Sequence, residues 1–88
     1  MENQNTTGGA SSPMTYGEKA VGLTFNPAGD ADVVKIKELY SQIIDICNNK
    51  RLNLDKDTEG EKARLFSVAI TEAQTAQMWA VKAITFNI

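Results

Sequence analysis

The sequence predicts an all-α protein in which a short N-terminal helix precedes an antiparallel hairpin of two long helices. Apolar residues recur at steps of three and four in residues 30–49 and again in residues 59–85. A polar connection between these stretches has a length that suits an antiparallel pair. Both helices are apolar on several sides, which one partner helix cannot cover, so we expect homo-oligomerisation to complete the core.

Composition narrows the classes of protein to which the chain can belong. Its 88 residues carry a formal charge of -2, with one cysteine, Cys47, and no histidine. Disulfide scaffolds, common zinc sites and nucleophiles paired with histidine are therefore excluded, and we expect no metal and no cofactor. The interleaved charges predict no surface for a DNA or RNA duplex or for a membrane. No secretory signal or spanning segment is visible, so we expect an intracellular protein.

The first elements are set by capping signals. Residues 1–13 are rich in Asn, Thr, Gly and Ser, and we expect a flexible tail before a single domain over residues 14–88. Thr15 and Glu18 form a capping-box pattern, and Gly22 is suited to a left-handed end, so a short helix is predicted over residues 15–22. Asp30 is expected to cap the first long helix.

Two seams are expected to pack the long helices. Thr58 and Glu61 predict a capping box at the start of the last helix. Trp79 on that helix is assigned to core or interface packing. The seam of the first helix comprises Val33, Ile36, Tyr40, Ile43 and Cys47, flanked by Leu39, Ile44 and Ile46. The seam of the last helix comprises Phe66, Ala69, Ala73, Ala76, Ala80 and Ala83, and its small side chains favour close helix contact.

The chemistry that the sequence offers is binding rather than catalysis. No nucleophile with a base, metal cluster or phosphate loop is present, so we expect no enzymatic activity. In the N-terminal arm, Tyr16 can stack on a purine, and Lys19 or Lys37 can pair with phosphates. Amides of the turn at residues 26–29 can donate hydrogen bonds. Alternatively, Tyr16 and Phe25 anchor the arm to the bundle and the lysines form a solvated face.

Several segments together resemble the anti-CBASS protein two family of bacteriophages, over about residues 16–86. They are residues 16–22 (YGEKAVG), 25–30 (FNPAGD), the pair Ile36-Lys37, residues 67–71 (SVAIT) and residues 78–83 (MWAVKA). The resemblance implies a compact hexamer in the cytoplasm of the bacterial host. It also implies a sponge that sequesters cyclic dinucleotides such as 3′,3′-cyclic GMP-AMP at subunit interfaces, and cyclic trinucleotides in separate pockets, without cleaving them.

The resemblance also implies residue roles. A tyrosine of the arm stacks on the ligand and a lysine early in the first long helix reaches its phosphates; Tyr16 and Lys37 match these positions, with Lys19 as the rival lysine. Relatives carry an arginine before Thr71, where this chain has Ile70. Arg64 is the candidate replacement, and a surface salt bridge is its alternative role. The expected ligand-binding residues are Tyr16, Gly17, Lys19, Phe25, Asn26, Pro27, Lys37, Arg64 and Thr71. A helical oligomeric module that binds a protein and no nucleotide is the competing interpretation.

Overall fold

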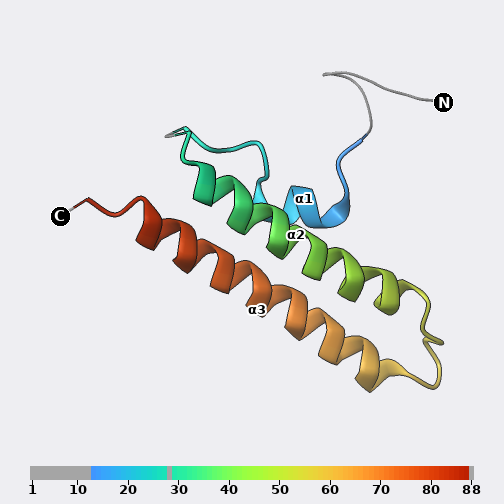
Figure 1. The fold of residues 1–88 in the computed structure, drawn as a ribbon. Coiled ribbons are helices and arrows are strands. Elements are labelled where there is room, and N and C mark those ends of the chain that lie inside the picture. Colours follow the sequence, from blue (N-terminus) through green and yellow to red (C-terminus); the bar gives the residue numbers. More distant parts are fainter. Residues whose placement is uncertain (1–12, 28, 88) are drawn as a thin grey trace.

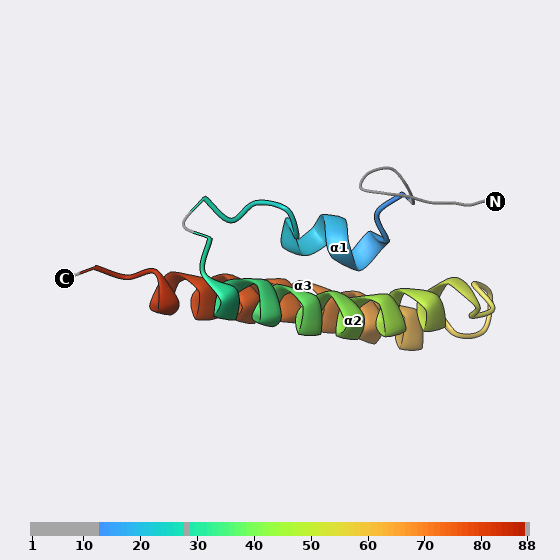
Figure 2. The ribbon, with the colours of Figure 1, turned by 45° about the horizontal axis from the view of Figure 1, so that its top comes forward.

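The computed structural model describes residues 13–27 and 29–87, and within these residues it contains three helices and no strand (Figure 1). They are α1 (Tyr16–Val21), α2 (Ala31–Leu52) and α3 (Gly60–Ile84). The two long helices run antiparallel, and α1 lies on one face of the pair (Figure 2). The all-α class is therefore confirmed. Most of the tail expected over residues 1–13 lies outside the described residues.

The capping signals at both ends of α1 act as predicted. The Thr15 hydroxyl accepts a hydrogen bond from the Glu18 N–H at 3.0 Å, and the Thr15 N–H donates to Oε1 of Glu18 at 2.9 Å. This reciprocal pair is the predicted capping box. Gly22 adopts a φ of 62°, which glycine tolerates, and ends the helix after Val21.

The two long helices differ in how they begin. Asp30 caps α2 as predicted, since its carboxylate accepts from the N–H groups of Asp32 and Val33 at 2.7 and 3.2 Å. The Thr58 capping box predicted for α3 is wrong. Glu59 occupies the capping position without a side-chain cap. Its carboxylate instead accepts from the Asp55 N–H at 2.9 Å and closes the connecting turn.

All three helices contribute to the buried core, to which α2 gives both Val33 and Ile44. Val21, Ile44 and Ile70 pack together, and Ile44 is fully buried. The seam predicted for α2 placed Ile43 inward and Ile44 on its flank, whereas Ile43 is half exposed. The difference arises because α2 contacts α1 as well as α3, so its buried stripe is turned toward both neighbours.

The alanine seam predicted for α3 lies at the border of the contact between the helices. Ile70 and Gln77 are the buried residues of this helix, while Ala69 and Ala76 are exposed. The buried stripe again faces two neighbours, and Nε2 of Gln74 on its flank reaches the Ala20 carbonyl oxygen of α1 at 3.5 Å. Ala73 of the seam packs against the core, so small side chains form only part of the contact between α3 and α2.

The face of the hairpin opposite α1 is apolar, and no described residue covers it (Figure 2). On α2 it presents Leu39, Ile43 and Ile46, which share one side of the helix at steps of four and three. On α3 it continues through exposed residues that include Leu65. Trp79 is 66% exposed, so it does not belong to the core of the single chain. No helix among the described residues has the length and apolar character needed to cross a bilayer.

The crossing of α1 over α2 requires glycine at position 17. The Gly17 N–H donates to Oδ1 of Asp45 at 2.7 Å, and the residue is buried against α2. A Cβ added at this position would lie 2.1 Å from the carbonyl oxygen of Ser41, a backbone atom. Any larger residue must therefore move α1 away from α2.

We expect Gly17→Ala to lower the free energy of unfolding by about 1–3 kcal/mol, because the added methyl group overpacks this crossing. Urea unfolding followed by circular dichroism measures the change. Gly60→Ala is the matched control, since a Cβ there meets nothing within 4 Å. The control should leave stability unchanged or raise it by up to about 1 kcal/mol. Equal stability of the two variants would contradict the packing described.

Candidate functional site

Lys37 of α2 is a buried lysine that ties the segment after α1 to the hairpin. Only 4% of its surface is exposed. Its ammonium donates to the Gly22 carbonyl oxygen at 2.9 Å and to the carbonyl oxygen of Phe25. The nitrogen lies 5.5 Å from the centroid of the Phe25 ring, within reach of a cation–π interaction. An ammonium has three N–H groups, so one remains for a further acceptor.

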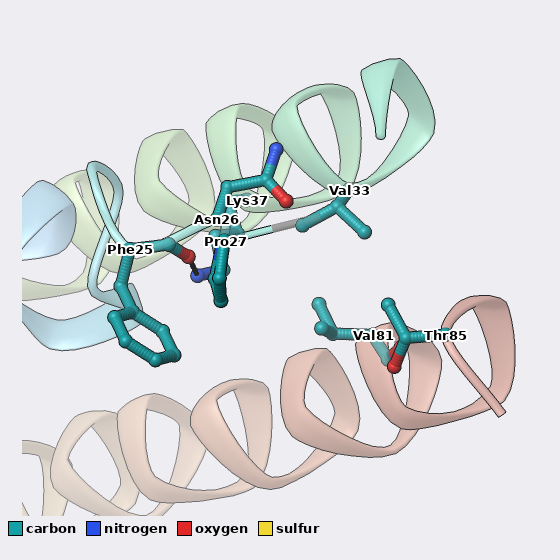
Figure 3. A pocket seen from close by; sticks show the side chains of 7 residues that line it. All are labelled: Phe25, Asn26, Pro27, Val33, Lys37, Val81 and Thr85. Atoms are coloured by element: carbon teal, nitrogen blue, oxygen red, sulfur yellow. Dashed lines mark hydrogen bonds between the residues drawn. The ribbon is translucent and has the colours of Figure 1, made fainter. Parts of the chain in front are cut away.

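The segment after α1 and the end of α3 enclose a cavity of about 200 Å³ (Figure 3). Phe25, Asn26 and Pro27 face Val81 and Thr85 of α3 across it. The segment is held by a turn, because the Phe25 N–H donates to the Gly22 carbonyl oxygen at 2.9 Å. The Phe25 ring is 72% exposed, so it does not anchor the arm in the core. We call this cavity the Phe25 pocket.

A larger open hollow of about 690 Å³ adjoins the Phe25 pocket and shares Phe25 and Lys37 with it. Lys19 of α1 and Lys82 of α3 also line it. No acidic residue is among the described residues that line either cavity. We call this hollow the lysine groove. Its three cations and one exposed ring suit an anionic ligand with a flat face.

Five of the nine residues expected at the site meet around these two cavities: Lys19, Phe25, Asn26, Pro27 and Lys37. Tyr16 and Gly17 lie at the other end of α1. Gly17 is buried against α2, whereas Tyr16 keeps 47% of its surface exposed. Tyr16 does not line either cavity. Tyr16 and Lys37 therefore do not line the same cavity among the two described.

Arg64 and Thr71 lie on exposed positions of α3 outside both cavities. Arg64 donates to both carboxylate oxygens of Glu61, at 3.0 and 2.7 Å. This contact lowers the pKa of Glu61 and raises the pKa of Arg64. The surface salt bridge that the sequence left open for Arg64 is therefore present.

Two cationic residues, Lys82 and Arg51, were not identified from the sequence as candidates for the site. Lys82 was not among the residues expected at the site, yet it lines the lysine groove. In an antiparallel hairpin, residues equally far from the turn face each other, so the start of α2 lies beside the end of α3. The same register puts Lys37 and Lys82 in the half of the hairpin that lies away from the turn. Arg51, whose guanidinium lies over the Tyr16 ring, gave no comparable signal.

The arrangement favours non-covalent capture of a ligand. Ammonium groups can bind phosphate oxygens, and the exposed rings of Phe25 and Tyr16 can stack on bases. Within residues 13–27 and 29–87, no cluster of three or more histidine, cysteine, aspartate or glutamate side chains is placed to hold a metal ion.

Comparison with known proteins gives one family. The model of a family described as Acb2/Tad1, hairpin domain, matches residues 18–85 of the 88. The match includes most of α1, all of α2 and α3, and every residue expected at the site except Tyr16 and Gly17. It confirms the resemblance drawn from the sequence. No curated protein and no solved structure shows significant similarity to the chain.

We expect Lys37→Met to loosen the segment after α1, because the Phe25 carbonyl oxygen loses its charged donor. The free energy of unfolding should fall by about 1.5–3 kcal/mol, the usual contribution of a hydrogen bond to a charged group. Hydrogen exchange should show faster exchange of the amides at residues 23–26. Lys35→Met is the matched control, since Lys35 lies on the same helix and is exposed. If both variants exchanged alike, Lys37 would not hold this segment.

Proposed function

Because the chain belongs to the Acb2/Tad1 hairpin-domain family, we propose that it is a sponge that captures cyclic oligonucleotide messengers of bacterial CBASS defence. It binds the messenger without breaking it, and so lowers the free concentration that reaches the receptor. The ligands are cyclic dinucleotides such as 3′,3′-cyclic GMP-AMP, together with cyclic trinucleotides. The protein acts for a bacteriophage in the cytoplasm of its bacterial host.

The observation that carries this proposal is the cationic lining around Lys37. Lys19, Lys37 and Lys82 line one groove, and no described residue in its lining is acidic. A ligand with phosphates would meet this lining without like-charge repulsion. Lys37 still has one N–H to offer after its two contacts with carbonyl oxygens. The exposed Phe25 ring at the same place offers a face to a base.

The proposal assigns roles to all nine expected residues. Tyr16 stacks on a base, and Lys37, with Lys19 beside it, pairs with phosphates. Phe25, Asn26 and Pro27 form one wall of the pocket. Gly17 holds α1 in place through its contact with Asp45. Arg64 takes the ligand role of the arginine that relatives carry before Thr71, and Thr71 supplies a hydroxyl.

The positions of Tyr16 and Lys37 support association between copies of this chain. They lie at opposite ends of α1 within one chain, since the Lys37 ammonium meets Gly22 at the end of this helix. We propose that the ligand lies between two protomers, so that Tyr16 of one protomer and Lys37 of the other contact it. The uncovered apolar face of the hairpin supplies a surface on which copies can pack. We propose a homo-oligomer, and specifically a hexamer.

Titration calorimetry with 3′,3′-cyclic GMP-AMP tests the binding function. We expect saturable binding, and recovery of the intact ligand after the protein is denatured. Tyr16→Ala should weaken binding by about 1–3 kcal/mol, or roughly 5- to 150-fold in Kd, because one stacked base loses its platform. Phe86→Ala removes an exposed aromatic residue outside the described cavities and should leave Kd unchanged.

The outcomes separate the competing interpretations. Recovery of linear nucleotides would indicate an enzyme and overturn the sponge. A flat titration would favour the helical module that binds a protein partner. Binding that is insensitive to Tyr16→Ala would leave capture in place but remove Tyr16 from the site.

Light scattering combined with size-exclusion chromatography tests the assembly. We expect the unmodified chain to elute as a hexamer. Ile46→Glu should dissociate it, because Ile46 is 62% exposed on the apolar face and a buried unpaired carboxylate is costly. Thr58→Glu adds the same charge at an exposed position in the turn between α2 and α3 and should leave the assembly intact. A monomeric unmodified chain at micromolar concentration would contradict the proposal.

A further inference from the structure

Arg51, in the last turn of α2, joins all three helices at one guanidinium group. Its Nη1 donates to the Ser67 hydroxyl of α3 at 3.0 Å, and its Nη2 donates to Oδ1 of Asn48 at 2.7 Å. The carbon of the guanidinium lies over the ring of Tyr16 in α1, 5.7 Å from its centroid. This distance is within the range of a cation–π interaction.

The groups that hold Arg51 are neutral. Among the described residues, no carboxylate lies within ion-pair distance of its guanidinium. No acid among the described residues therefore compensates the charge, and the Tyr16 ring is the group set against it. Arg51 is half-buried, so it is less mobile than an arginine that extends into solvent.

The guanidinium of Arg51 lies over one face of the Tyr16 ring, and other parts of the residue are accessible to solvent. Tyr16 retains 47% of its surface exposed even though the guanidinium lies over it. A ring that turns freely must be ordered when a base stacks on it, and that loss of entropy weakens binding. A ring already held by a fixed cation avoids most of this loss.

We propose that Arg51 is a positioning residue, which fixes the orientation of the Tyr16 ring so that a purine base can stack on the open side. This inference rests on the proposed function, since it takes Tyr16 as the stacking platform. Arg51 acts through Tyr16 and does not itself contact the ligand.

The geometry requires arginine rather than another cation at this position. The planar guanidinium reaches Ser67 and Asn48 from two nitrogens while one face stays over the ring. A lysine ammonium has no planar fork and cannot keep these three contacts in the same way. Arg51→Lys should therefore behave more like Arg51→Gln than like the unmodified chain.

The test is a double-mutant cycle read by titration with 3′,3′-cyclic GMP-AMP. Arg51→Gln should raise Kd roughly tenfold, within the range of coupling between contacting residues. In a Tyr16→Ala background the same change should have almost no further effect, because Arg51 acts only through the ring. Lys50→Gln removes a cation from the adjacent exposed position and should leave Kd unchanged.

A second readout follows the ring itself. The ring protons of Tyr16 should shift in the NMR spectrum of the ligand-free Arg51→Gln variant, and should stay in place in Lys50→Gln. Ser67→Ala removes the acceptor of Nη1 and should produce a smaller shift and a smaller rise in Kd. If Arg51→Gln failed to fold, Ser67→Ala would carry the test, and unchanged Kd and ring signals in it would overturn the inference.

Failure of this inference can be told apart from failure of the sponge function. If the unmodified chain did not bind the ligand, the proposed function would fail. If it bound, and Tyr16→Ala weakened binding while Arg51→Gln did not, only the positioning role would be wrong. Additive effects of the two variants, with a weaker salt dependence in Arg51→Gln, would instead indicate direct phosphate contact and overturn positioning.

Discussion

The ammonium of Lys37 is the contact on which the rest of the structure depends. It is buried, and it holds the carbonyl oxygens of Gly22 and Phe25, where α1 ends and the next segment begins. One cation therefore ties both the C-terminal end of α1 and the wall of the Phe25 pocket to α2. A buried charge without an acidic partner is unfavourable unless other groups stabilise it. Here carbonyl oxygens and an aromatic ring do so, and an anionic ligand would add to them.

The sequence predicted the helices better than it predicted their buried sides. Capping by Thr15 and Asp30 was readable because a side-chain oxygen meets nearby amides, a contact that depends on local spacing alone. The Thr58 cap failed because Glu59 turns its carboxylate back to Asp55. Ile44 is buried in place of Ile43 because α1 docks on that side of α2. The periodicity of α2 alone carries no information about where α1 docks.

The site was partly readable for a similar reason. Phe25, Asn26 and Pro27 are neighbours in the chain, so their meeting at one pocket follows from a single turn. The burial of Lys37 could not be inferred, because lysine is usually exposed and nothing local marks this one. Lys82 and Arg51 meet their partners only through tertiary packing. Residues that a turn or cap brings together are thus predictable, and residues joined by helix docking are not.

The central claim is that assembled copies of this chain hold a cyclic nucleotide without altering it. The uncovered apolar face of the hairpin supports packing of copies against one another, and we propose that the site is completed between protomers. Native mass spectrometry of the protein mixed with 3′,3′-cyclic GMP-AMP tests this most directly. The account predicts hexamers carrying ligand of unchanged mass; single chains without ligand, or complexes carrying a hydrolysed product, would contradict it.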